Sequence, residues 1–309
     1  MTLALTLAGA LAVGISLGLL GGGGSILTVP LLVYLAGVEP KQAIAMSLFV
    51  VAATALAGVL PHARAGRVRW RTALLFGAAG MVGAYLGGRL GAYIPGGVLL
   101  VAFAVMMVVT ALAMLRRRPA PAEGAGHTSG ERPILRILAE GVTVGLVTGL
   151  VGAGGGFLVV PALVLLGGLS MPVAVGTSLV VIAMKSVAGL AGYLYSVSLD
   201  WPLTLAVTAV AVVGGFAGSR LAGRIDPQRL RDAFGWFVLV MAAFVLTAQA
   251  PAGVRHALFG TPGGWAGLGV LLLAGAALLA YRVRSRALAA ERAQDASGRS
   301  PLESAEQRS

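Results

Sequence analysis

Reactive and ionisable side chains are scarce in this chain of 309 residues. There is no cysteine, which excludes disulfide bonds and thiolate metal sites. Only 11% of the residues are charged, whereas roughly 25% is usual for a soluble domain. The hydrophobic content of 58% and the mean hydropathy of +0.91 indicate that most of the chain lies in a lipid bilayer.

Motifs of common enzymes are also missing. The chain has no GxxxxGK[ST], HExxH or GxSxG sequence. The three acidic residues nearest to the apolar stretches, Glu39, Glu140 and Asp200, fall near the ends of those stretches, so there is no candidate for a carboxylate proton relay. Three histidines are isolated in predicted loops: His62, His127 and His256. We predict that the protein is not an enzyme and that it uses no cofactor and no metal.

Apolar stretches long enough to cross a membrane are frequent, since a spanning helix needs about 17–25 residues. They cover 43–61, 72–94, 97–115, 173–195, 202–219, 233–250 and 264–281. Two further apolar segments, 8–37 and 140–168, are interrupted by glycine runs. The sequence therefore predicts an all-α polytopic membrane protein. Because no basic residue precedes it, Met1–Gly14 is expected to belong to the first membrane segment and not to a cleaved signal peptide.

The two glycine-broken segments belong to an internal repeat. Adding 131 to a position in the first half gives its counterpart in the second half, without any gap. The matched residues in the first half are Gly14, Gly18, Gly21, Gly23, Gly24, Pro30, Ser47, Gly58, Trp70, Gly83, Gly87 and Arg89. Their counterparts are Gly145, Gly149, Gly152, Gly154, Gly155, Pro161, Ser178, Gly189, Trp201, Gly214, Gly218 and Arg220. Each repeat is predicted to hold a glycine-broken re-entrant or discontinuous helix and about three spans.

The predicted organisation has five parts. Residues 1–115 and 139–250 form the two transmembrane repeats, and 116–138 is a basic cytoplasmic linker. Residues 251–281 contain an extra C-terminal span, and 282–309 form a polar tail.

Arginine distribution predicts the orientation of these parts. Four loops are strongly basic, and they lie at 64–71, 116–136, 220–231 and 282–286. The positive-inside rule assigns such loops to the cytoplasm. All four are cytoplasmic only if the segment 140–168 enters and leaves on the same face, which makes the two repeats inverted. The alternative is a plain count of four spans per half with parallel repeats. This loop distribution also explains the net charge of +12 without a nucleic-acid partner.

The glycine runs predict a binding site. Non-helical backbone at membrane depth must line a cavity or be buried in protein. A helix that begins at Ser25 or Phe157 would direct free N–H groups at the break, which suits an anion. Paired breaks in two repeats are also the pattern of transporter substrate sites. The alternative for the runs is close helix packing, which is our interpretation of the scattered glycines Gly80, Gly83, Gly87 and Gly88.

Lys185 is the most informative single residue, because it lies near the middle of the span 173–195. An unpaired lysine at this depth suggests an anionic substrate as its partner. The alternatives are a snorkelling lysine or one bonded to carbonyls of the glycine runs. Its counterpart is Thr54, so the site would be only pseudo-symmetric. The hydroxyls of Ser47, Thr177 and Ser178 lie one to two turns before Thr54 and Lys185. They could donate hydrogen bonds to an oxyanion or form hydrogen bonds between helices. The predicted substrate-binding residues are Gly21, Gly22, Gly23, Gly24, Ser25, Ser47, Thr54, Gly152, Gly154, Gly155, Gly156, Thr177, Ser178 and Lys185.

Three stretches carry a family resemblance: GLLGGGGSILTVPLL, GLVGAGGGFLVVPAL and GTSLVVI. Together they resemble the sulfite exporter TauE/SafE family of membrane permeases, over about residues 10–250. The resemblance implies a multi-pass inner-membrane transporter of small sulfur oxyanions or organosulfonates such as sulfite or sulfoacetate. We expect alternating access between the halves, a bilayer environment, a cytoplasmic C-terminus and the possibility of a homo-oligomer. The alternatives are a passive anion channel and a permease for another small organic anion.

Overall fold

The structure, a computed structural model, describes residues 2–20, 23–116, 134–152, 154–156, 159–160, 163, 169–221 and 227–249. Contacts divide the chain after Gln249, and all described elements belong to the unit Met1–Gln249. The predicted extra span at 251–281 and the tail at 282–309 lie outside the described residues, as does most of the linker 116–138.

All of the elements in these ranges are helical. In chain order they are α1 (Thr2–Leu20), η1 (Gly23–Leu27), α2 (Thr28–Pro30), η2 (Leu31–Leu35), α3 (Pro40–Arg64), α4 (Trp70–Gly91), α5 (Gly96–Arg116), α6 (Ile134–Val151), α8 (Met171–Tyr193), α9 (Trp201–Leu221) and α10 (Pro227–Gln249). Within the described part of the chain, four helices are long and apolar enough to cross a membrane: α3, α4, α8 and α9. The all-α class predicted from the sequence is confirmed.

The ends of these helices follow from local sequence. Pro40 begins α3, where a missing N–H costs nothing. After that helix Gly66 adopts a φ of +67°, the left-handed conformation that ends many helices. Asp200 caps α9, because its carboxylate accepts a hydrogen bond from the N–H of Leu203 at 3.1 Å. This acidic residue therefore stabilises the start of a helix, and it lies 15 residues after Lys185 in the chain.

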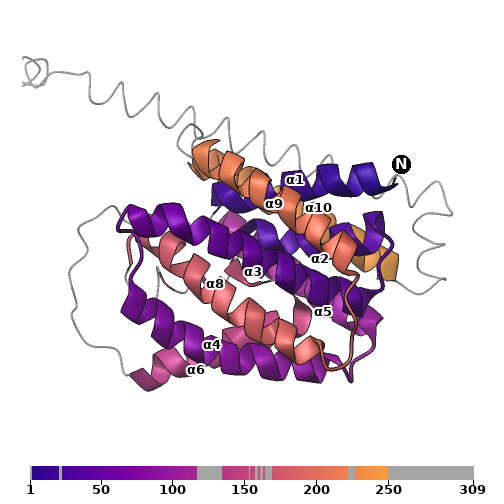
Figure 1. Ribbon diagram of the computed structural model, residues 1–309, viewed down its shortest axis with the longest axis horizontal. Helices are drawn as coiled ribbons and strands as arrows, with labels where there is room; N and C mark the ends of the chain where they lie inside the picture. The colour runs from indigo at the N-terminus through magenta and orange to yellow at the C-terminus, as the bar shows by residue number, and fades with distance from the viewer. Residues whose placement is uncertain are drawn as a thin grey trace, which may run out of the picture. The chain divides into compact units, whose positions relative to one another are not determined.

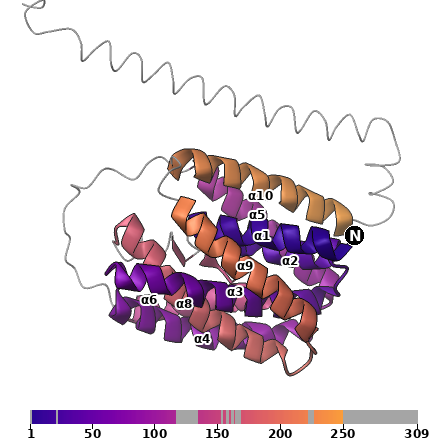
Figure 2. The same ribbon diagram turned by 45° about the horizontal axis from the view of Figure 1, so that its top comes forward.

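The helices lie in successive layers (Figures 1 and 2). α4 and α6 lie side by side at one edge, and α8 and α3 form the next layer. α9 and α1 follow, and α5 packs against α10, beyond α1 in the view of Figure 2. Contacts link the first layer to the second through α4 with α8, and the second to the third through α3 with α9, while α5 also contacts α3 and α6.

Glycine allows two helix pairs to touch backbone to backbone. In the α1–α9 pair, a side chain at Gly14 would meet the carbonyl of Ala211. In the α4–α6 pair, a side chain at Gly145 would meet the carbonyl of Gly80. Gly145 is the counterpart of Gly14, and Ala211 is the counterpart of Gly80, so the same contact occurs twice. The prediction that the scattered glycines serve close packing is confirmed for Gly83, Gly87 and Gly88, where an added side chain would meet a backbone carbonyl of a neighbouring helix.

The other contacts of these two pairs recur in the same way. Gly18 meets Gly215, and the counterpart Gly149 meets Ala84. The contact positions advance together along both helices, so α1 runs parallel to α9 and α4 runs parallel to α6.

The first glycine-broken segment turns back on itself. Gly9 of α1 faces the side chains of Leu31 and Leu35, so the chain after the break returns antiparallel to α1. A regular half-helix starting at Ser25 is expected from the sequence, but the return path is irregular: a 3-10 turn in η1, one α turn in α2 and a π turn in η2. Glycine at the start and Pro30 in the middle disfavour one continuous hydrogen-bond ladder.

α3 and α8, which occupy counterpart positions, pack against each other in antiparallel directions. At one end Gln42 Nε2 near the start of α3 donates to the carbonyl of Ser198, just beyond α8, at 3.1 Å. At the other end the N–H of Arg69, beyond α3, donates to Thr177 Oγ1 near the start of α8, also at 3.1 Å.

Candidate functional site

Lys185 is the centre of the site. It lies on α8 with 1% of its surface exposed, beside Gly80 near the middle of α4. Its Nζ donates a hydrogen bond to Thr148 Oγ1 at 3.0 Å. In the part of the chain that the structure describes, this neutral hydroxyl is the hydrogen-bond partner of the ammonium. A buried cation with a neutral partner keeps most of its charge uncompensated, which is costly unless a ligand shares the site.

Thr148 is held in place to receive that hydrogen bond. It lies in the last turn of α6, and its hydroxyl approaches the carbonyl of Val144 at 2.7 Å. Because the hydroxyl proton is donated there, an oxygen lone pair stays available to Lys185. The sequence analysis missed Thr148, since a threonine that bonds its own helix is common in apolar spans and its counterpart is Leu17.

The second glycine run passes directly over the ammonium. Gly152, Gly154 and Gly155 have φ values of +74°, +59° and +70°. A Cβ atom at Gly155 would collide with Lys185 Nζ and with the side chain of Thr148. Only glycine can adopt this left-handed backbone and also lie this close to the Lys185 side chain. The position of the run therefore depends on glycine at residue 155.

Ser47 fixes the start of this run against α3. Its Oγ donates to the carbonyl of Gly152 at 2.6 Å, and both residues are buried. Two residues further on, a side chain at Gly154 would meet Val51, which is close to the middle of α3. The break therefore reaches the middle of the helix bundle. After it, Val159 and Leu163 pack with Phe76 near the start of α4, so the chain returns toward the end from which α6 came.

The structure brings together five of the predicted site residues: Ser47, Gly152, Gly154, Gly155 and Lys185. We call these residues with Thr148 the lysine site. Gly156 follows Gly155 in the chain and is buried. Thr177 and Ser178 lie elsewhere on α8, since Thr177 is eight residues from Lys185, about 12 Å along a helix. Ser178 Oγ bonds the carbonyl of Val175 in its own helix.

The first glycine run differs from the second. Gly23 and Gly24 lie in the 3-10 turn η1, followed by the fully buried Ser25. Gly21 and Gly22 fall outside the described residues. The described glycines of the first run have helical backbone, whereas Gly152, Gly154 and Gly155 of the second run have left-handed backbone. The two breaks therefore differ in conformation.

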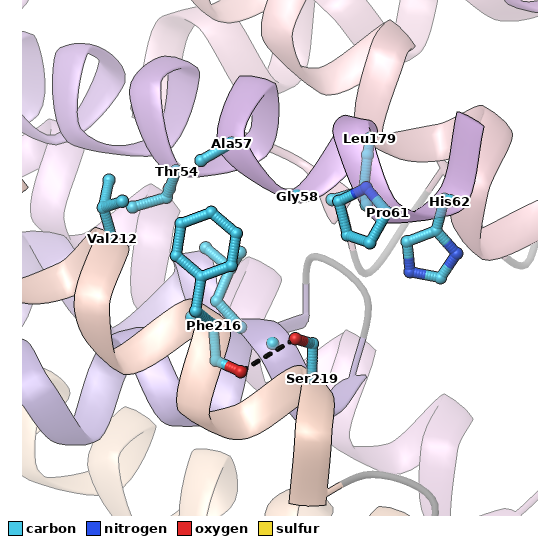
Figure 3. Close-up of a pocket in the computed structure, with 12 residues that line it drawn as sticks. Thr54, Ala57, Gly58, Pro61, His62, Leu179, Val212, Phe216 and Ser219 are labelled. Carbon is cyan, nitrogen blue, oxygen red and sulfur yellow. Dashed lines mark hydrogen bonds between the residues drawn. The ribbon is translucent and has the colours of Figure 1, made fainter. Parts of the chain in front are cut away.

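Thr54, the counterpart of Lys185, lines a separate cavity between α3 and α9 (Figure 3). Its hydroxyl bonds the carbonyl of Val50 in its own helix at 2.7 Å. We call this cavity the α3–α9 cleft. It is lined by Leu17, Gly18, Thr54, Ala57, Gly58, Pro61, His62, Leu179, Val212, Gly215, Phe216 and Ser219. Its volume of about 20 Å³ is close to that needed for one water molecule.

The lysine site offers chemistry for holding an anion. The Lys185 amine, the Thr148 hydroxyl and a turn of left-handed glycines meet in a buried position. Within the described residues no group of three His, Asp or Glu side chains lies close enough to hold a metal ion.

Comparison with known proteins decides the family. The family model described as sulfite exporter TauE/SafE matches residues 5–245. The chain belongs to this family. A probable membrane transporter protein of Xylella fastidiosa strain 9a5c is 36% identical over 237 residues, which are 76% of this chain and 91% of that protein. The probable membrane transporter protein YdhB of Bacillus subtilis is 28% identical, over 71% of this chain and 90% of its own length.

The resemblance of the three motifs to the TauE/SafE family is thereby confirmed, and the chain is a membrane transporter of that family. A probable membrane transporter protein of Methanocaldococcus jannaschii is 27% identical over 251 residues, 76% of this chain and 91% of that protein. No solved structure gives a significant match.

Proposed function

We propose that the protein is a secondary transporter, in the export direction, of small anions of the sulfur oxyanion or organosulfonate class, such as sulfite or sulfoacetate. Lys185 supplies the charge that holds the anion, with help from the N–H groups of Gly154 and Gly155. Thr148 positions the lysine, and Ser47 positions the start of the second glycine run. The observation that carries the proposal is a lysine amine that is fully buried and hydrogen-bonded to a neutral hydroxyl. An anion is the partner that such a group lacks.

Alternating access is the mechanism that we propose, with the two repeats inverted. The antiparallel packing of the counterpart helices α3 and α8 supports inversion. The doubled glycine contacts of α1–α9 and α4–α6 support a pseudo-two-fold axis, because an interface between two like halves repeats each contact in exchanged form. With the arginine-rich loops in the cytoplasm, such an axis lies in the membrane plane of the inner membrane.

Flux into proteoliposomes tests the function. Uptake of radiolabelled sulfite, sulfate and a small sulfonate should saturate for at least one of them, and preloaded unlabelled anion should accelerate the exchange. Flux that rises linearly with concentration and shows no exchange would favour a passive channel. Repeating the assay with an imposed pH gradient shows whether protons are coupled.

Lys185→Met tests the site. The variant keeps a flexible side chain of similar length, and we expect it to abolish the flux while the protein still inserts and purifies as a single species. Val187→Ala is the matched control, because Val187 lies on the same helix with 49% of its surface exposed. Wild-type flux in Lys185→Met would remove this residue from the site.

A further inference from the structure

The two halves of the molecule are not in the same state. In the first half, the α3–α9 cleft separates Thr54, Pro61 and His62 on α3 from Phe216 and Ser219 on α9 (Figure 3). It lies at the ends of α3 and α9 that adjoin the basic loops.

The counterpart region in the second half is closed. There α8 and α4 touch through backbone, because a side chain at Gly88 would meet the carbonyl of Gly189. Gly192 is packed as tightly, with the carbonyl of Tyr85 only 2.6 Å from where its Cβ would lie. Gly189 and Gly88 are the counterparts of Gly58 and Ser219, two lining residues of the cleft.

One hydrogen bond holds the closed end. Tyr193, at the end of α8, is fully buried, and its hydroxyl donates to the carbonyl of Leu150 at 2.5 Å. That carbonyl belongs to the last turn of α6, just before the second glycine run. Beside it the Arg89 guanidinium lies 4.3 Å from the ring centre of Tyr195, which ties α4 to the chain beyond α8.

The counterpart of Tyr193 is His62, and it lacks such a bond. His62 lies in the last turn of α3, not in a loop as expected from the sequence, and it lines the cleft. Its Nδ1 is buried, and among the described residues it has no hydrogen-bond partner. The counterpart of the Leu150 carbonyl is that of Leu19, in the last turn of α1, which also lines the cleft through Leu17 and Gly18.

We propose that Tyr193 and His62 are the two gates of the transport path. In this structure Tyr193 closes its end by bonding Leu150, whereas α3 and α9 are separated by the α3–α9 cleft, which has room for about one water molecule. In the opposite state a ring N–H of His62 donates to the carbonyl of Leu19, α3 closes on α9, and Tyr193 releases Leu150. This inference rests on the proposed transport function, and it specifies which residues exchange roles when the accessible side changes.

Helix α3 contributes both to the cleft and to the surroundings of the lysine site. Thr54 at its inner wall is one helical turn from Val51. Val51 is the residue that Gly154 of the second glycine run contacts. Val51 is fully buried in this structure, and we expect wider opening of the cleft to expose its helix turn while the Tyr193 end stays sealed.

Thiol labelling tests the gates, because the chain has no cysteine of its own. Ala57→Cys places a thiol on the cleft wall, and Ala188→Cys places one at the counterpart position, where Ala188 is 8% exposed. In lipid nanodiscs a small water-soluble methanethiosulfonate should label the first faster than the second. We expect a ratio of about tenfold or more, since a minor conformer is typically at or below 10%.

Gate variants should then move the two labelling rates in opposite directions. His62→Tyr installs in the first half the gate of the second, so labelling at Ala57→Cys should fall and labelling at Ala188→Cys should rise. Tyr193→Phe removes the bond to Leu150. Like His62→Tyr, it should lower labelling at Ala57→Cys and raise labelling at Ala188→Cys. Tyr93→Phe is the matched control, because it loses a hydroxyl from a residue that is 81% exposed.

Reciprocal shifts in either gate variant support the proposal. Rates that stay unchanged, or that rise or fall together, overturn it, and the two variants protect the test against misfolding of one of them. Saturable flux without reciprocal labelling would overturn the gates and leave the transport function. Reciprocal labelling without flux of any sulfur anion would leave the gates and overturn the proposed substrate class.

Discussion

At the scale of single residues, Thr148 is the side chain on which the state of Lys185 depends most directly. Thr148→Val keeps the shape and loses the hydroxyl, so the ammonium loses its neutral partner. A buried donor left unpaired costs about 1–3 kcal/mol, more when it is charged. We predict a lower unfolding temperature and a flux reduced about tenfold, since each 1.36 kcal/mol is a factor of ten in rate. Thr148→Ser, which retains the hydroxyl, should stay near wild type; equal flux in both variants would contradict the prediction.

Gly155 provides a second test at this scale, because its counterpart Gly24 has helical backbone. Gly155→Ala forces a left-handed alanine and directs its methyl group at Lys185 Nζ. We predict a severe loss of flux for Gly155→Ala and a smaller loss for Gly24→Ala, measured in the same proteoliposome assay. Equal effects would mean that the two glycine runs act alike in spite of their different backbones.

The residues of the site were predictable to different degrees. A single lysine within an apolar span is visible in any sequence, and Lys185 is the centre of the lysine site. Thr148 was not predictable, because its partner is 37 residues away and its counterpart is apolar. His62 was assigned to a loop because the predicted span ends at residue 61, but α3 continues to Arg64 with Pro61 inside it. The contacts that decide these roles are between helices, and spacing along the chain does not encode them.

At the scale of elements, the glycines of α4 separate two kinds of contact. Gly83 touches the backbone of α6, whereas at Gly80 the nearest atom to an added Cβ is 3.6 Å away, an ordinary contact. We predict that Gly83→Val lowers the unfolding temperature and the yield of monodisperse protein, because two backbones must separate. Gly80→Ala should be tolerated, since its counterpart is already Ala211. Equal stability of the two variants would show that α4 and α6 do not pack in this way.

The helices themselves were predictable from composition, and the broken segments were not. The predicted spans 43–61 and 202–219 lie within α3 and α9, because long apolar runs bounded by glycine, proline and arginine permit little else in a bilayer. The first break combines 3-10, α and π turns. Such turns depend on what the surrounding helices leave room for, so a rule based on local propensity cannot choose among them.

At the scale of the whole molecule, the relation between the two repeats determines where the counterparts Ala65 and Ser196 lie. Ala65 follows α3 and Ser196 follows α8, and both are exposed. If the repeats are inverted, these positions face opposite sides of the membrane; if they are parallel, they face the same side. A cysteine introduced at each position, in a chain that has none, reports the side directly.

We predict that an impermeant maleimide applied to intact cells labels Ser196→Cys and leaves Ala65→Cys unlabelled until the membrane is opened. The reason is that Ala65 lies in an arginine-rich loop, which the positive-inside rule retains in the cytoplasm, while the chain near Ser196 has no arginine. Ser170→Cys, at the start of α8, should behave like Ala65→Cys, because the N–H of Arg69 binds Thr177 at that end of the bundle. Labelling of both Ala65→Cys and Ser196→Cys from outside would refute inversion. The exchange of gates between His62 and Tyr193 would then lose its basis, since two gates related by a parallel repeat would open to the same side.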